Sequence, residues 1–286
     1  MPSNFVINYS GREGSSAVIN SLGWQRDVCV PLLEDLDLRN YRRKHPAFML
    51  YKKLAEVFES GVYKEADPNY AHPAAQHFAS GRMSVGFKWR VFGNIEKIAR
   101  VFAQHNVVVF QLSRRDFLSL VCSDYTHTYA RKIQSKMAID PHPQFQLRKL
   151  SEAERNDYSE QISELDFRLK KSWFLKSAKE IARIKAEQRA NLQVFAAAGV
   201  KVRSVYYENF DMDKEAFIKS MMAELGLDTT AAFNPNCTFY KVHKRPITER
   251  IEGLSAFINS SNRYKKYERT YNQVLEDFQK LSGIPS

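Results

Sequence analysis

Short apolar runs alternate with longer segments of mixed apolar and charged residues along the chain. The short runs are rich in Val, Ile and Phe, which is typical of strands buried on both faces of a parallel sheet. The clearest is Val107–Leu112. The runs predicted as strands are residues 5–7, 28–30, 85–90, 107–112 and 200–207.

The intervening segments have the apolar spacing of helices. Ser151 to Ala198 predicts one or two long helices, ended by Gly199. Asp211 or Asp213 is the predicted N-cap of a helix that runs to Leu225. The other predicted helices begin near residues 17 and 117, lie within 40–60 and 95–105, contain Ile251, and cover 263–281. Strands that alternate with helices predict an α/β fold, a parallel sheet with helices on both faces, in a single domain over residues 1–286.

The turn after the first strand reads Gly11-Arg12-Glu13-Gly14-Ser15-Ser16. Gly14 permits a close backbone approach, and Ser15 stands where a helix begins, so backbone N–H groups at the positive end of a helix dipole can hold an oxyanion. A nucleotide-binding G-x-x-x-x-G-K-[ST] loop would need a lysine directly after Gly14, and the cation here is Arg12 instead. A sulfuryl group carries less charge than a phosphoryl group with its Mg²⁺, so the turn favours sulfuryl transfer. The alternative interpretation is an ordinary turn of small residues.

Positively charged residues also lie within or just after two other predicted strands. Lys88 lies inside an otherwise apolar run, where its charge is costly to bury unless it is used. Arg114 and Arg115 follow the run 107–112, and Ser123 lies eight residues after Arg115, about two helical turns along. An anion site at these strand ends is one interpretation, and solvated side chains are the other.

Acidic residues follow the second predicted strand at Glu34, Asp35 and Asp37. Open α/β sheets keep their sites beyond the C-terminal ends of strands, so one of these carboxylates is a candidate general base. They are equally typical of solvated caps. Near the C-terminus, Lys244 and Arg245 form a basic cluster.

The chain has 43 basic and 32 acidic residues, a net charge of +11, which favours an anionic partner such as a nucleotide, an acidic glycan, a nucleic acid or a membrane surface. Hydrophobic residues at 44% indicate a folded protein. Cys29, Cys122 and Cys237 form no C-x-x-C pair, so neither a disulfide framework nor a zinc site is expected. With no secretory signal and no apolar run long enough to span a bilayer, we expect a cytoplasmic protein.

Four separated stretches together resemble the sulfotransferases that use 3′-phosphoadenosine-5′-phosphosulfate (PAPS), in particular their bacterial and carbohydrate-type branch. Residues 11–16 look like the family's G-R-S-G-[ST]-[ST] loop, and Gly86-Phe87-Lys88 looks like its G-[FL]-K strand. Arg114-Arg115-Asp116 with Ser123 looks like its 3′-phosphate motif, and Tyr207-Glu208-Asn209-Phe210 looks like its Y-E-[DN]-[LF] segment. Glu13 departs from the pattern, because the family usually has serine there.

The resemblance implies a P-loop NTPase-like sheet and the reaction of PAPS with an acceptor hydroxyl, giving 3′-phosphoadenosine-5′-phosphate (PAP). The backbone of residues 12–16, Gly11 and the hydroxyls of Ser15 and Ser16 would hold the 5′-phosphosulfate, while Arg12 and Lys88 would stabilise charge on the bridging oxygen. No metal is required.

For the 3′-phosphate, the resemblance implies Arg115 and Ser123, with Tyr207, Lys244 and Arg245 as further cofactor-binding residues. Glu34 is the predicted base, and Asp35 and Asp37 are its substitutes. The acceptor would be a carbohydrate or glycoconjugate. The oligomeric state stays open.

Two other functions remain open. A P-loop kinase shares the predicted fold but needs the missing lysine and a magnesium-binding aspartate. A basic nucleic-acid-binding protein would explain the net charge, but the arginines cluster at strand ends, which suits a pocket better than a groove, so no nucleic acid is expected as a partner.

Overall fold

The computed structural model describes residues 2–31, 36, 49–61, 84–133, 151–164, 166–235 and 246–282. By their packing these residues belong to two compact units. The first unit comprises Met1–Arg115, Glu187–Cys237 and Leu275–Ser286. The second comprises Asp116–Ala186 and Thr238–Val274. This division does not test whether either unit folds alone, so the single domain stays a prediction.

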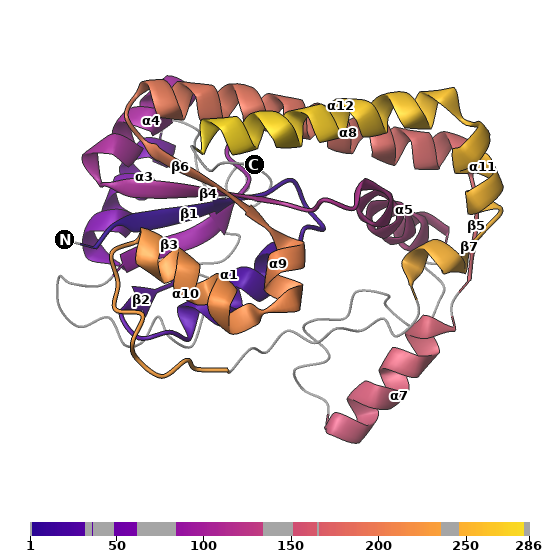
Figure 1. Cartoon of the computed structure of the whole chain (residues 1–286), viewed down its shortest axis with the longest axis horizontal. Coiled ribbons are helices and arrows are strands. Elements are labelled where there is room, and N and C mark those ends of the chain that lie inside the picture. The colour runs from indigo at the N-terminus through magenta and orange to yellow at the C-terminus, as the bar shows by residue number, and fades with distance from the viewer. Residues whose placement is uncertain are drawn as a thin grey trace. The chain divides into compact units, whose positions relative to one another are not determined.

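A five-stranded parallel sheet forms the centre of the first unit (Figure 1). Its strands are β1 (Asn4–Asn8), β2 (Val28–Cys29), β3 (Ser84–Trp89), β4 (Val107–Ser113) and β6 (Lys201–Tyr206). They are arranged in the order β2-β3-β1-β4-β6. The five apolar runs therefore form strands as predicted, and the parallel α/β fold is confirmed.

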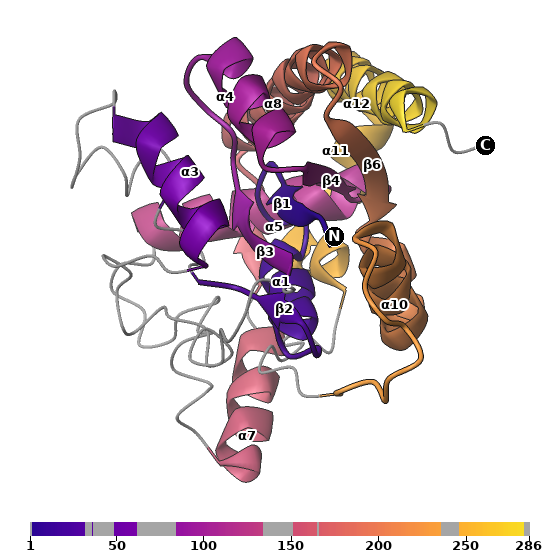
Figure 2. The same cartoon turned by 90° about the vertical axis from the view of Figure 1, so that its left-hand side faces the viewer.

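Helices cover both faces of this sheet. On one face, α1 (Ser15–Gly23), α9 (Tyr207–Met212) and α10 (Lys214–Glu224) pack with Phe5, Ile7 and Phe110 of the central strands. Figure 2 shows α10 on one side of the sheet, with α3 (Leu50–Ser60) and α4 (Ile95–Gln104) on the other.

The second face is an aromatic layer. Phe58 of α3 stacks on Phe87, and Phe102 of α4 contacts both Trp89 and Phe195. Phe195 belongs to α8 (Lys171–Ala197), whose last eleven residues lie in the first unit.

Buried amides fix the strand ends at one edge of the sheet. Asn8 and Gln111 are register partners on β1 and β4, and Asn8 Nδ2 donates to Gln111 Oε1 at 2.7 Å. Gln111 Nε2 in turn donates to Gln188 Oε1 of α8 at 3.1 Å. Because all three side chains are buried, this chain of hydrogen bonds holds the last residues of β1 and β4 side by side.

The predicted boundary of one helix agrees with its observed cap. Asp213, rather than Asp211, caps α10, since its carboxylate accepts from the Ala216 N–H at 2.9 Å. Tyr207 was predicted as the end of a strand but is the first residue of α9.

The second unit is mostly helical. Its elements are α5 (Phe117–Ile133), α7 (Glu152–Ser163), β5 (Phe167–Arg168), the first part of α8, the 3-10 turn η3 (Ile247–Arg250), β7 (Ile251–Glu252), α11 (Leu254–Ser260) and most of α12 (Asn262–Leu281). In its core, the ring of Tyr264 on α12 contacts both Phe117 of α5 and Phe174 of α8. The long helical segment expected over 151–198 is confirmed as two helices, α7 and α8.

One detail of the second unit contradicts the predictions. Ile251 was expected in a helix but lies in β7, where it pairs with Phe167 of β5. The backbone of Gly253 is left-handed, with φ of 77°, so α11 begins only at Leu254. Both strands are two residues long, too short for a period of alternation to appear in the sequence.

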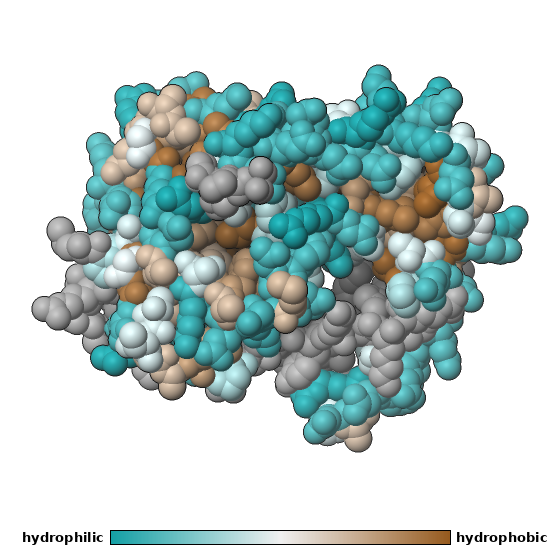
Figure 3. All heavy atoms as spheres, viewed as in Figure 1, coloured by the Kyte–Doolittle hydropathy of each residue, from teal (hydrophilic) through white to brown (hydrophobic). Residues whose placement is uncertain are grey.

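Figure 3 shows hydrophilic residues over most of the visible surface of α12 and α8. Within the part of the chain that the structure describes, no helix is both long enough and apolar enough to cross a lipid bilayer.

Candidate functional site

The turn between β1 and α1, residues 11–16, has an uncommon backbone. Gly11, Arg12 and Gly14 have φ of 115°, 60° and 77°, and arginine rarely adopts the left-handed conformation. Helix α1 starts directly after this turn, with the N–H groups of Ala17 and Val18 bonded to the Gly14 carbonyl. Left-handed residues directly before a helix N-terminus turn backbone N–H groups toward one point, which is the geometry of an anion site.

Gly14 is required for packing as well as for conformation. A Cβ atom at this position would lie 2.1 Å from Cδ2 of Tyr207, the first residue of α9. No side chain fits in that space. The turn therefore lies directly against the aromatic ring that follows β6.

The carboxylate of Glu13 points back to the end of β1. Its Oε2 accepts the Ser10 N–H at 2.6 Å, and the residue is 0% exposed. The residue that departs from the family pattern is thus part of the internal hydrogen bonding of the turn.

Lys88 brings an ammonium group to the start of α1 from the neighbouring strand. It lies on β3 in register with Ile7 and is only 3% exposed. Its Nζ donates to Ser16 Oγ at 2.5 Å and lies 5.4 Å from the centre of the Tyr9 ring. Because a buried ammonium is costly unless it is compensated, these contacts identify Lys88 as part of the site.

Arg115, just beyond β4, is oriented by residues at the end of β6 and the start of α9. Its N–H donates to Glu208 Oε1 at 2.9 Å, and its guanidinium lies 4.3 Å from the centre of the Tyr206 ring. A longer hydrogen bond of 3.4 Å joins Nη1 to Asn209 Oδ1. Burial raises the pKa of the Tyr206 hydroxyl, while the charge of Arg115 acts in the opposite direction. The Arg115 side chain is exposed, so its guanidinium is oriented yet accessible to a ligand.

Tyr207 connects the two arginine-bearing turns. Its ring contacts the position of Gly14 on one side, and the Arg114 guanidinium lies 5.3 Å from its centre. Arg12 and Arg115 each follow the paired residues Asn8 and Gln111 by four positions. The structure therefore places the 11–16 turn, Lys88, Arg115 and Tyr207 at the same edge of the first unit's sheet.

The other predicted site residues lie in the second unit or outside the described residues. Ser123 lies on α5 in the second unit, so its role beside Arg115 stays a prediction. Glu34, Asp35, Asp37, Lys244 and Arg245 lie outside the described residues.

Sequence reasoning missed Tyr206 and Glu208 as contacts of Arg115. The available signal was their position at the end of an alternating strand, on either side of Tyr207. The contacts themselves depend on β6 lying beside β4, which no local pattern specifies.

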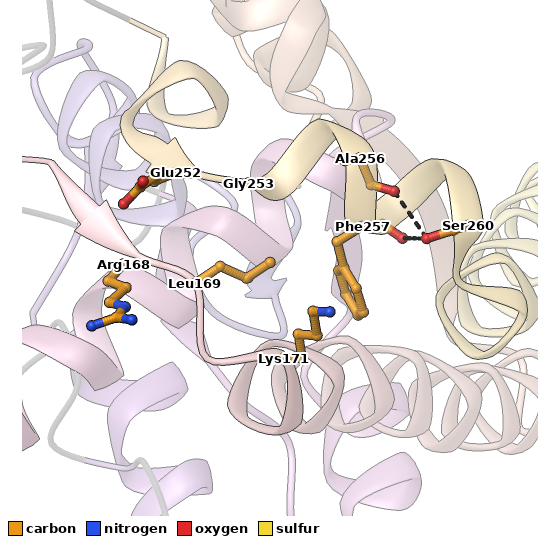
Figure 4. A pocket seen from close by; sticks show the side chains of 8 residues that line it. All are labelled: Arg168, Leu169, Lys171, Glu252, Gly253, Ala256, Phe257 and Ser260. Atoms are coloured by element: carbon orange, nitrogen blue, oxygen red, sulfur yellow. Dashed lines mark hydrogen bonds between the residues drawn. The ribbon is translucent and has the colours of Figure 1, made fainter.

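A cavity of about 560 Å³ lies within the second unit (Figure 4). Lys171 and Phe257 line it close together, with the ammonium 5.8 Å from the centre of the ring. The Ser260 hydroxyl is bonded to the Ala256 and Phe257 carbonyls of its own helix. The lining residues are Arg168, Leu169, Lys171, Glu252, Gly253, Ala256, Phe257 and Ser260, and none of them was predicted as a site residue.

Neither described cysteine has the properties of a nucleophile. Burial raises the pKa of the Cys29 thiol to about 11, and burial together with Asp116 raises the pKa of Cys122 further. Among the described residues, no group of three or more His, Cys, Asp or Glu side chains could hold a metal ion.

Comparisons with known proteins give a likeness only at the level of solved structures. No protein-family model matches the chain, and no curated protein matches its sequence. Among solved structures, the chain is similar to the crystal structure of a sulfotransferase from Alicyclobacillus acidocaldarius. The identity is 14% and the TM-score is 0.47, and the match covers 100% of this chain and 98% of the other. At these values the likeness alone assigns neither a family nor an activity.

Proposed function

We propose that this protein is a sulfotransferase that moves a sulfuryl group from PAPS to an acceptor hydroxyl, on a carbohydrate or glycoconjugate. The observation that carries the proposal is the buried Lys88 ammonium bonded to Ser16 at the start of α1, beside a left-handed turn. Such an arrangement binds an oxyanion. The resemblance of the turn to the phosphosulfate loop identifies that anion as the 5′-phosphosulfate.

The residues of the turn fit this group. Hydrogen-bond donors are available from the first turn of α1 and from the hydroxyls of Ser15 and Ser16, while Arg12 and Lys88 supply positive charge. When bound, PAPS would supply an activated sulfuryl group. Arg12 and Lys88 would stabilise the charge that develops on the phosphate oxygen as the S–O bond breaks. Arg12→Ala should therefore lower the rate of PAP release from PAPS at least about a hundredfold, and near-normal release would refute this role.

The 3′-phosphate would bind at Arg115. Stacking on Tyr206 and the bond to Asn209 orient the guanidinium before the ligand arrives, which lowers the entropic cost of a charge-assisted contact. We include Ser123, Lys244 and Arg245 among the residues that would bind this phosphate. Tyr207 would support the site through its contact with the 11–16 turn at Gly14.

The acceptor hydroxyl would lose its proton to a carboxylate, for which Glu34 is our choice and Asp35 and Asp37 are substitutes. The distribution of charge supports an acceptor that is itself anionic. The second unit has 21 basic and 13 acidic residues, so it accounts for +8 of the net charge of +11. Its cavity, lined in part by Arg168 and Lys171, is large enough for a small saccharide.

Calorimetry tests the proposal. PAP should bind without added metal, and ATP with Mg²⁺ should bind far more weakly. Tight binding of Mg-ATP with no affinity for PAP would favour the kinase. Steeply salt-dependent binding of an oligonucleotide, again without affinity for PAP, would favour the nucleic-acid binder.

A further inference from the structure

Glu13 is the residue of the 11–16 turn whose charged side chain the proposed function does not use. An acidic residue beside an anion site repels the ligand unless its charge is directed elsewhere. Here the carboxylate is completely buried and accepts the Ser10 N–H at 2.6 Å. This hydrogen bond joins the two ends of the segment from Ser10 to Glu13.

The same four-residue pattern occurs elsewhere in the chain and shows what is particular to this turn. Ser151-Glu-Ala-Glu154 begins α7, and its two end residues form the reciprocal capping box. Glu154 Oε2 accepts the Ser151 N–H at 2.7 Å, and Ser151 Oγ accepts the Glu154 N–H at 3.3 Å. That box is exposed and leads into a right-handed helix.

In Ser10-Gly-Arg-Glu13, the glutamate carboxylate likewise accepts the N–H of the serine three residues earlier. The backbone between these two residues, however, is left-handed at Gly11 and Arg12. The Ser10 hydroxyl is buried and makes no hydrogen bond within the described residues. A buried hydroxyl without a protein partner is normally satisfied by a ligand or by water. The backbone N–H of Ser10 is thus bonded to Glu13 within the turn, whereas the Ser10 hydroxyl has no hydrogen bond to the described residues.

We propose that Glu13 is a positioning residue, which holds the 11–16 turn in its left-handed conformation before the ligand binds. The Ser10 N–H is then occupied by the carboxylate and does not contact the ligand. The ligand is bound instead by the later part of the turn, through the N–H groups at the start of α1, Ser16 and Lys88. The proposal rests on the proposed function only in naming that ligand as PAPS.

The test compares Glu13→Ala and Glu13→Gln with Glu154→Ala as the matched control. Glutamine keeps an acceptor oxygen for the Ser10 N–H, whereas alanine removes it. Hydrogen exchange at the Ser10 amide and calorimetry with PAP are the two measurements. Glu13→Ala should accelerate Ser10 exchange and weaken PAP binding roughly tenfold or more, Glu13→Gln should restore both, and Glu154→Ala should change neither.

Unchanged Ser10 exchange in Glu13→Ala would overturn the proposal, as would faster exchange with unchanged or tighter PAP binding. If Glu13→Ala does not fold, Glu13→Asp, whose side chain is one methylene shorter, provides the same comparison with Glu13→Gln. A wild-type protein that fails to bind PAP would overturn the proposed function. The Ser10 amide would still show whether Glu13 holds the turn.

Discussion

A substitution of Lys88 should change the affinity for the ligand without lowering the stability of the fold. The side chain is 3% exposed, so Lys88→Met keeps the volume of the stem while removing the ammonium and its bond to Ser16. A hydrogen bond from a charged donor to a bound anion contributes about 2 kcal/mol. The dissociation constant for PAP should therefore rise about thirtyfold. The folded protein without ligand should gain stability or lose none, because the variant no longer buries a charge.

Two measurements on the same samples test this reasoning, calorimetry with PAP and thermal unfolding without ligand. Lys53→Met is the matched control, since Lys53 is also buried, at 8% exposure, but lies on α3. The control should bind PAP as the wild type does. A Lys88→Met protein that binds PAP normally, or that loses PAP binding only in proportion to a fall in Tm, would refute the role of the ammonium.

Three further predictions follow from other contacts. Arg115→Ala should weaken the binding of PAP at least about tenfold but leave the affinity for adenosine 5′-phosphate unchanged. Calorimetry that shows equal losses of affinity for both ligands would contradict a 3′-phosphate site. Gly14→Ala should lower unfolding free energy by about 1–3 kcal/mol, because its φ is 77° and an aromatic ring occupies the space of a Cβ; denaturant titration measures this. Partial burial raises the pKa of Glu224, but hydrogen bonds from Lys201 and Arg203 outweigh burial and lower that pKa below its ordinary value. This carboxylate therefore stabilises the fold fully above about pH 4.5 and loses that effect as the pH falls toward its folded pKa, so Glu224→Gln should flatten the acid limb of a Tm-against-pH curve.

The sheet could be predicted from the sequence because a strand buried on both faces needs a continuous apolar run. Val107–Leu112 shows this most clearly, since it forms nearly all of β4. The pairing of Ile251 with Phe167 could not be predicted, because two-residue strands leave no periodic pattern and their partners are far apart in the chain. Tyr207 was expected in a strand for a different reason. The alternation of β6 continues through a residue whose backbone already belongs to α9.

The site could be predicted in part, and the limit has a physical basis. The 11–16 turn is contiguous, so its glycines and hydroxyls are visible as a motif. Lys88 was predicted as a site residue from its place in an apolar run, but its contact with Ser16 was not, because Lys88 reaches Ser16 only when β3 pairs with β1 in a register that sets Ile7 beside it. Glu13 has a separate place in this turn. Its buried carboxylate accepts the Ser10 N–H at the start of the turn, whereas the Lys88 ammonium bonds to Ser16 at the other end, where α1 begins. A turn that lacks its own lysine can thus bind an anion, provided that the neighbouring strand supplies the cation and an internal carboxylate is directed away from the ligand.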